Sequence, residues 1–189
     1  MSMVSVDAPD VDALITLSTG FMSKFDYHNA MREGHGYNLY VADLLATFGI
    51  PKVDVPDFTI ATTHDEIRDK TLNEKDIVVD DLILEVKSSS RSFTDIDDFP
   101  HNPLIVDTVY GFDRKIIKPF AYVIISQKTL NILVIPVATK YDWGIQEYYD
   151  AQRDITERFY MVRKRHCRPF IELVDILLER AHERTNQMQ

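Results

Sequence analysis

The chain has 189 residues, of which 45% are hydrophobic and 27% are charged. These ordinary values exclude wholesale disorder and predict one globular domain over residues 1–189. The single cysteine, Cys167, excludes an intramolecular disulfide and a multi-cysteine zinc site. The formal net charge is −9, from 21 basic and 30 acidic residues. This charge argues against a protein that coats nucleic acid, but not against an enzyme that acts on it, because local charge governs steering.

The hydrophobic pattern gives no sign of a membrane protein. No apolar run approaches the ~20 residues that cross a bilayer. The first residues, MSMVSVDAPDVDALITL, lack the basic segment and the continuous apolar segment of a secretion signal. We therefore expect a cytoplasmic protein with no membrane contact.

Two helices are predicted in the first third of the chain. One follows Asp7 or Pro9 and continues through residues 11–17. The other has apolar residues at helical spacing over 37–48, and Gly49 and Pro51 end it. Residues 51–74 are polar and irregular, and the Thr63-x-x-Glu66 spacing is that of a capping box for one short turn.

The strongest local pattern predicts a β-hairpin over residues 76–87. Two β-rich runs in DIVVDDLILEVK flank a two-residue turn, Asp80-Asp81. Residues 88–103 then form a long polar loop. Three apolar runs predict strands over 104–109, 121–126 and 130–137, and their continuous apolar character indicates a sheet covered on both faces.

The last third of the chain is predicted to be helical. We expect one helix over about 145–165 and another that begins at Pro169, so that helices account for about 145–187. The whole pattern is that of an α/β fold, in which a central mixed sheet is flanked by helices and followed by a C-terminal helical segment. The core of this domain lies over about 33–137.

The predicted hairpin brings three charged side chains together. With Asp80-Asp81 as the loop, Asp76 lies opposite Glu85, and cross-strand partners have Cβ atoms about 5 Å apart on one face. Alternation along the strand places Lys87 on the face of Glu85. The three groups therefore project together from one end of an otherwise apolar hairpin.

Two carboxylates this close repel each other unless a cation lies between them. Carboxylate and water oxygens suit Mg²⁺ or Mn²⁺, and a lysine beside such an ion can hold or deprotonate a water. This chemistry is that of a metal-activated water attacking a phosphodiester. The alternative is an exposed hairpin end that carries a Glu-x-Lys ion pair, which is a common tripeptide.

The pattern Asp76-x8-Glu85-Val86-Lys87 on a hairpin, after an amphipathic helix flanked by glycine, resembles the PD-(D/E)XK nuclease superfamily. This superfamily includes many restriction endonucleases, phage exonucleases and junction resolvases. The resemblance covers about residues 33–137 and implies a restriction-endonuclease-like fold. It also implies that Asp76, Glu85 and the main-chain carbonyl of Val86 bind the metal. By the same resemblance, Lys87 positions or activates the water.

The sequence departs from the motif before its aspartate. Lys75 precedes Asp76, where the family motif has proline. A literal Pro56-Asp57 lies 28 residues before Glu85 and leaves Asp57 as an alternative motif aspartate. Asp76 is preferred because hairpin geometry places it opposite Glu85.

Two further departures concern helices. Many family members carry a glutamate on the preceding helix, where this chain has Asn38, with Glu33 one turn earlier. Asn38 could hold a metal-bound water, although a surface amide is the expected role. The helix that normally follows the E-x-K strand is not evident in 88–103.

Other candidate residues lie outside the motif. The group that leaves the motif strand is expected either to contact the scissile phosphate or to be a solvated strand exit: Ser88, Ser89, Ser90 and Arg91. The window 153–168 is net +4, and its Arg163, Lys164 and Arg165 either follow DNA phosphates or form a charged helix face. Asp107 either faces the motif site or, as we expect, pairs elsewhere as a buried strand residue.

These observations lead to one expected function and its alternatives. We expect a Mg²⁺- or Mn²⁺-dependent DNA endonuclease of restriction, phage or repair type. It would be a homodimer built on the C-terminal helices, in the cytoplasm of a prokaryote or encoded by a phage. One alternative is a non-catalytic member of the same fold that binds nucleic acid or protein. Another is an unrelated acidic interaction domain, for which 76–87 is not a hairpin.

Overall fold

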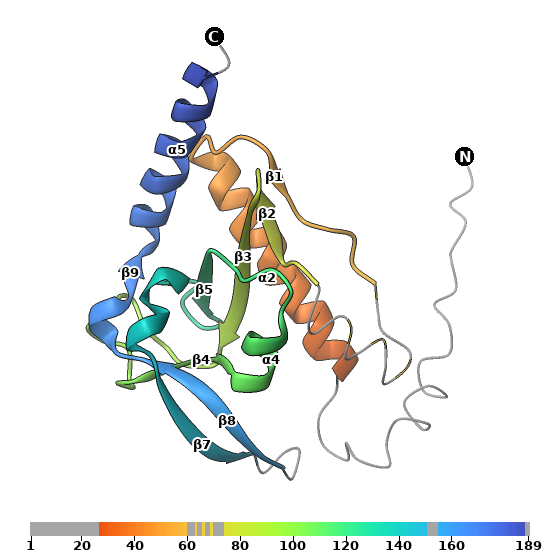
Figure 1. Ribbon diagram of the computed structural model, residues 1–189, viewed down its shortest axis with the longest axis vertical. Coiled ribbons are helices and arrows are strands. Elements are labelled where there is room, and N and C mark those ends of the chain that lie inside the picture. The colour runs from red at the N-terminus through yellow and green to blue at the C-terminus, as the bar shows by residue number, and fades with distance from the viewer. Residues whose placement is uncertain are drawn as a thin grey trace.

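A computed structural model describes residues 27–59, 63, 66, 69, 74–150 and 155–187, so the helix predicted after Asp7 lies outside the described residues. The elements follow one another along the chain as α2 (Tyr27–Thr47), β1 (Val53–Asp54), β2 (Ile77–Val79), β3 (Leu82–Ser89), β4 (Leu104–Thr108), α4 (Val109–Arg114), β5 (Ala121–Ser126), β6 (Ile132–Pro136), the 3₁₀ helix η1 (Val137–Asp142), β7 (Gly144–Asp150), β8 (Ile155–Val162), the 3₁₀ helix η2 (Lys164–His166), β9 (Arg168–Pro169) and α5 (Phe170–Gln187) (Figure 1).

The predicted hairpin is confirmed as β2 and β3. Its register pairs Val79 with Leu82 and Ile77 with Leu84, so Asp80-Asp81 is the two-residue turn. Asp80 has a φ of 54°, a conformation that aspartate tolerates better than most residues. The strand pairing ends at Ile77 and Leu84, so the predicted backbone pair of Asp76 with Glu85 is not formed. The hairpin contradicts the expectation that distinguished an unrelated acidic interaction domain, namely that this segment is not a hairpin.

A central six-stranded sheet has the order β1-β2-β3-β5-β6-β9. Strands β3 and β5 are parallel, and the other neighbouring pairs are antiparallel, so the sheet is mixed. The parallel pair needs a long crossover. Residues 90–120 supply it and include β4 and α4 on the way.

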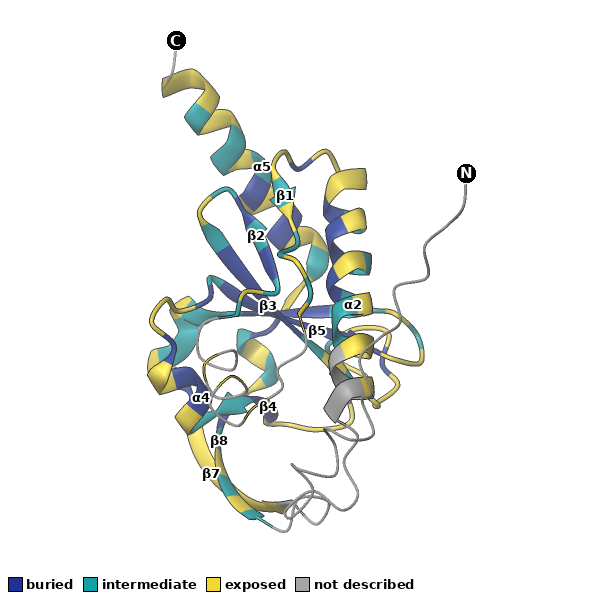
Figure 2. Cartoon of the chain, turned by 90° about the vertical axis from the view of Figure 1, so that its right-hand side faces the viewer, coloured by how far each residue is buried: buried dark blue, intermediate teal, exposed yellow. Residues whose placement is uncertain are grey.

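The central sheet is covered on both faces, as predicted from its apolar strands. Helices α2 and α5 pack on one face, where they share a buried core with alternate residues of β3, β5 and β6. The other face packs on a second sheet, of order β4-β8-β7, and on the segment around Phe93 and Phe99. Figure 2 shows the buried residues concentrated on the central strands and on the inner side of α2. The chain is therefore a mixed α/β domain.

The helix predicted over 37–48 is confirmed and begins earlier, at Tyr27. It ends at Thr47, and Gly49 follows with a φ of +84°, the left-handed conformation typical of the residues after a helix. The amide of Ile50 donates to the carbonyl of Leu45, and that of Gly49 to Ala46. At the predicted capping box, the Glu66 amide donates to Thr63 Oγ1 at 3.2 Å.

The helix predicted over 145–165 is wrong, because this segment contains the antiparallel hairpin of β7 and β8. Along β8 the residues from Ile155 to Phe159 alternate between half-buried and exposed, which is the period of a strand. The many charged residues resemble a helix surface, but tertiary pairing with β4 decides the outcome. The helix predicted after Pro169 is confirmed as α5. An interface built on C-terminal helices would therefore rest on α5 alone.

The polar loop after β3 and the strand that follows it are both shorter than predicted. The loop predicted over 88–103 starts later, because Ser88 and Ser89 still belong to β3, and the described residues from Ser90 to Pro103 contain no helix. The strand at 104 ends at Thr108, whose Oγ1 accepts from the Gly111 amide and begins α4. None of the helices in the described part of the chain is both long and apolar enough to cross a membrane.

Candidate active site

The predicted motif residues meet at the open end of the β2–β3 hairpin. Glu85 and Lys87 lie beside Tyr122 and Ile124 of β5, on the sheet face that packs against the second core. Glu85 is buried, and Lys87 Nζ lies 2.9 Å from its Oε1, while 40% of the Lys87 side chain is exposed. Lys87 therefore joins a buried carboxylate to solvent.

Asp76 lies one residue before β2, beyond the last backbone pair of the hairpin. Its Oδ2 accepts a 2.7 Å hydrogen bond from the Val86 amide, and its Oδ1 accepts one of 3.2 Å from Asn38 Nδ2 on α2. The aspartate side chain thus takes the place of a strand partner for Val86. Asn38, which we expected at the helix surface, is 9% exposed and holds this carboxylate.

The charges in this cluster change one another's acidity. Burial and the neighbouring charge of Glu85 raise the pKa of Asp76 to about 6, against the effects of Lys87, the Val86 amide and Asn38. Burial also raises the pKa of Glu85, but Lys87 and Lys115 outweigh it and hold that pKa below its usual value. Burial lowers the pKa of Lys87, but the three carboxylates of Glu85, Asp107 and Asp76 outweigh it and raise that pKa.

Lys115 is a second cation at Glu85 that the sequence did not reveal. Its Nζ donates to both carboxylate oxygens at 3.1 Å, and the side chain is buried. It stands just after α4, thirty residues from Glu85 in the chain. A lysine in a connecting segment normally points to solvent, so no local pattern could have identified it.

Asp107 belongs to the same cluster. As expected for a strand aspartate it has a partner, because Tyr122 donates its hydroxyl hydrogen to Asp107 Oδ2 at 2.8 Å. Tyr122 lies opposite Glu85 in the sheet, so this hydrogen bond brings Asp107 to the motif site, where its charge raises the pKa of Lys87. Burial and then the charge of Asp107 raise the pKa of Tyr122, which stays protonated as a hydrogen-bond donor.

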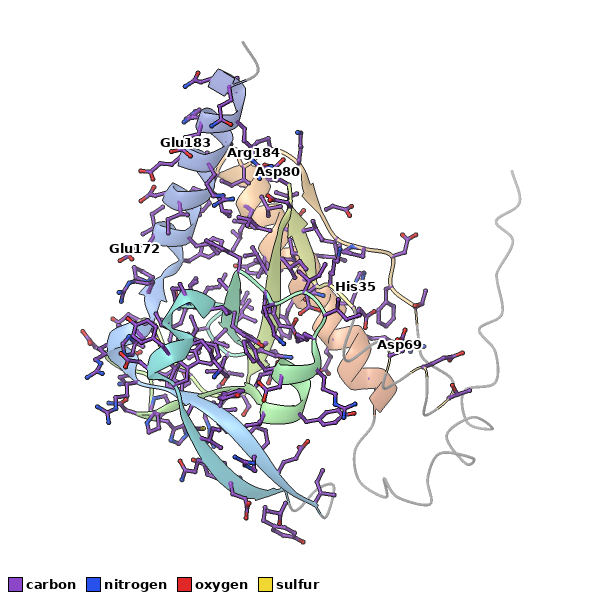
Figure 3. The ribbon with its side chains drawn as sticks, viewed as in Figure 1. His35, Asp69, Asp80, Glu172, Glu183 and Arg184 are labelled. Carbon is purple, nitrogen blue, oxygen red and sulfur yellow. The ribbon has the colours of Figure 1, made fainter. Side chains whose placement is uncertain are left out.

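Two cavities open on either side of the carboxylates, and residues 74–75 border both. One, of about 120 Å³, is lined by Asp76, Asn38 and Val86 together with His35 and Phe58. The rings of His35 and Phe58 stack with centroids 4.9 Å apart, and His35 is labelled beside α2 in Figure 3. The other, of about 210 Å³, is lined by Glu85 and its neighbours on the α4–β5 segment. Both carboxylates can therefore be reached by a small ligand.

The donor set suits a hard divalent cation that keeps several of its waters. The carboxylates of Asp76 and Glu85 and the carbonyl of Val86 are the oxygen donors that would hold it. Burial and then the negative charge of Glu85 raise the pKa of Asp76, and such a cation would offset that negative charge. Within the part of the chain that is described, no three acidic, histidine or cysteine side chains form a ready metal-binding group. Lys115 donates to both carboxylate oxygens of Glu85, so a metal ion bound there would share these oxygens with Lys115.

The alternative motif residues Asp57 and Glu33 are both exposed and lie outside the cluster. Asp57 is exposed, while its neighbours Pro56 and Phe58 line the cavity beside Asp76. Glu33 is exposed on α2. The geometry therefore places Asp76, rather than Asp57, in the cluster with Glu85.

The side chains of two of the four residues predicted to contact a phosphate, Ser88 and Ser89, form hydrogen bonds within the protein. Ser88 Oγ accepts from Gln127 Nε2, and Ser89 Oγ accepts from the Arg91 amide. Ser90 and Arg91 are exposed. Of these residues, Ser89 shares by alternation the sheet face of Glu85 and Lys87.

The basic segment that follows β8 lies elsewhere on the molecule. Lys164 Nζ donates to the carbonyl of Asp97, and Arg165 forms an ion pair of 3.7 Å with Asp142. Arg163 and Arg165 line a cavity of about 490 Å³ that shares no residue with the two cavities at the carboxylates. The structure therefore does not bring these cations to the motif site.

The cluster thus combines the carboxylates of Asp76, Glu85 and Asp107 with two lysines, of which Lys115 is buried and Lys87 has a side chain that is 40% exposed. Such an arrangement can bind a divalent cation and an anionic substrate together. Comparison of this chain with protein-family models, with curated proteins and with solved structures found no match.

Proposed function

We propose that this chain is a Mg²⁺- or Mn²⁺-dependent DNA endonuclease with a restriction-endonuclease-like fold. The observation that supports this most is the convergence of Asp76, Glu85 and Lys87 at one hairpin end. The mixed central sheet, with α2 packed beside the hairpin and β5 parallel to β3, is compatible with this fold.

The chain's own residues would have distinct tasks in the reaction. A bound divalent ion would lower the pKa of its water and offset charge on the phosphate oxygens. The Val86 amide and Asn38 fix the carboxylate of Asp76, and Lys115 fixes that of Glu85. Lys87 Nζ lies 2.9 Å from Glu85 Oε1, where it would position a water or a phosphate oxygen by donating hydrogen bonds.

The test is cleavage of supercoiled plasmid with Mg²⁺ or Mn²⁺ by Asp76→Asn, Glu85→Gln and Lys87→Met. We expect each variant to lose at least about 100-fold in rate, because each removes a charge that acts on the reacting groups. Asp57→Asn is the matched control and should cleave like the parent. Undiminished cleavage by all three variants would exclude this function. Loss in Asp57→Asn, Glu85→Gln and Lys87→Met, but not in Asp76→Asn, would make Asp57 the motif aspartate.

The contact of Lys115 with Glu85 favours a second candidate function, a non-catalytic protein of the same fold that binds nucleic acid or protein. In that case Lys115 would satisfy Glu85 permanently, in place of a metal ion. This candidate predicts that Mn²⁺ changes neither the melting temperature of the parent nor that of Lys115→Met. The endonuclease proposal predicts a rise in melting temperature with Mn²⁺ for the parent, because a ligand that binds only the folded state stabilises it.

A further inference from the structure

Two adjacent isoleucines are exposed to solvent at the rim of the cavity that Glu85 lines. Ile116 is 81% exposed and Ile117 is 57% exposed, and both line the 210 Å³ cavity. The charged residues of its lining are Glu74, Lys75, Glu85 and Lys115. They lie on the segment that joins α4 to β5 (Figure 1). Single exposed apolar residues are common, but two adjacent ones beside a candidate catalytic cluster are informative.

The segment that carries these isoleucines is fixed at both ends. Lys118 Nζ donates to the carbonyl oxygens of Phe112, Asp113 and Lys115 at 2.6, 2.8 and 2.9 Å, so it caps the C-terminal end of α4. Lys115 is held by Glu85, and the Phe120 amide donates to Ile83 at 2.7 Å. The exposure of the isoleucines is therefore built into the segment rather than a result of loose packing.

The charges around the isoleucines favour a polyanionic partner. Residues 114–118 read RKIIK, with three cations and no acid. Glu85 compensates Lys115, Lys118 donates to three neutral carbonyl oxygens, and exposed Arg114 lies over the Tyr110 ring at 4.9 Å. Lys118 adds positive charge while its hydrogen bonds stay within the segment, so Arg114 is the cation that would contact a phosphate. Proteins that bend DNA in this way hold phosphates with cations while an apolar side chain contacts bases.

We propose that Ile116 and Ile117 form an apolar wedge that enters a base step of duplex DNA beside the phosphodiester at Glu85. This inference rests on the proposed function and adds to it the way in which the DNA is held. Apolar wedges unstack a base step and bend the duplex, and the added protein contact offsets the cost of unstacking. A wedge at this rim would present the neighbouring phosphate to the carboxylates while Arg114 contacts the backbone.

The experiment uses the full chain in EDTA, so that binding is measured without cleavage. The probe is a set of short duplexes with 2-aminopurine at successive positions, because the fluorescence of this base rises when it unstacks. We expect the parent to raise fluorescence at one or two adjacent positions. Ile116→Thr/Ile117→Thr should lose this rise and bind about tenfold more weakly, as expected for the loss of two apolar contacts.

Two control proteins separate the wedge from other effects. Ile116→Leu/Ile117→Leu keeps the apolar volume and should unstack the base as the parent does. Ile105→Thr changes an isoleucine that is 50% exposed on β4 and should also behave like the parent.

Three results would overturn the wedge. They are an unchanged fluorescence rise in the double threonine variant, a parent that binds no duplex, and binding of phosphatidylserine vesicles but not DNA through these isoleucines. Because EDTA removes the metal, a fluorescence rise that depends on the isoleucines supports the wedge even if plasmid cleavage fails. Plasmid cleavage with no such rise retains the function and excludes the wedge.

Discussion

The carboxyl group of Asp76 lies next to the negative charge of Glu85, away from most solvent. Its raised pKa means that the folded protein keeps a proton between about pH 4 and pH 6 that the unfolded chain has lost. Folding stability from this group therefore decreases as the pH rises through that window. Glu85 behaves oppositely, because its lowered pKa adds stability above the unfolded value, which is lost as the pH falls through the folded one.

Asp76→Asn should therefore become more stable relative to the parent as the pH rises. In EDTA, we expect the difference in unfolding free energy to move in favour of the variant by roughly 1–2 kcal/mol between pH 4 and pH 6.5, since asparagine carries no charge for burial and Glu85 to disfavour. Urea unfolding at several pH values measures this difference. A difference that does not vary with pH would show that the pKa of Asp76 is not raised in the folded protein.

At the same scale, the sequence predicted some members of the cluster and not others. Asp76, Glu85 and Lys87 follow from strand alternation and a two-residue turn, which are local rules. Lys115 and the full role of Asp107 depend on how the crossover folds back over the sheet. That packing is set by contacts between residues distant in the chain, which one sequence does not display.

Among the elements, α2 offers a test in which the same substitution has opposite effects. Gly36 lies within the helix and Gly49 follows its end, and an added Cβ would meet nothing within 4 Å at either position. Gly36→Ala should stabilise the protein by about 0.5–1 kcal/mol, because alanine loses less backbone entropy in a helix. Gly49→Ala should destabilise it by about 1 kcal/mol, because its φ is +84°.

Thermal melts of the two alanine variants measure both effects on one helix. Equal shifts in the same direction would contradict the assignment of the helix end at Gly49. Space is not a confounding factor, since both sites are open.

The elements themselves were predictable to the extent that their patterns are local. The β2–β3 turn, the helix ended by Gly49 and the helix after Pro169 all have residues that favour one conformation. The segment of β7 and β8 was mistaken for a helix because its charges mask a period of two. Its Tyr148, Tyr149 and Thr156 favour strands, and they are the local signal for the observed structure.

For the molecule as a whole, the central sheet joins the two cores. Alternate residues of β5 enter different cores, with Val123 in the first and Tyr122 in the second. Leu45→Ala in the first core and Leu104→Ala in the second should each cost about 2–5 kcal/mol, because both side chains are fully buried.

We further expect Leu45→Ala to shift the urea transition seen by fluorescence of Trp143, which lies in the second core. Circular dichroism of the same samples should give the same midpoint. If Trp143 reported an unshifted transition, the two cores would unfold independently and the sheet would not couple them.

Because β9 comes late in the chain, the outer edge of β6 stays unpaired while the protein is being synthesised. Strand β6 is covered at its outer edge by Arg168 and Pro169, which are made only after the β7–β8 hairpin. Until the ribosome releases them, the outer edge of β6 is unpaired and open to other extended chains. Nascent chains on one messenger RNA are therefore most prone to edge-to-edge aggregation during that interval. A chaperone that binds unpaired strand edges would have its largest effect at the same stage.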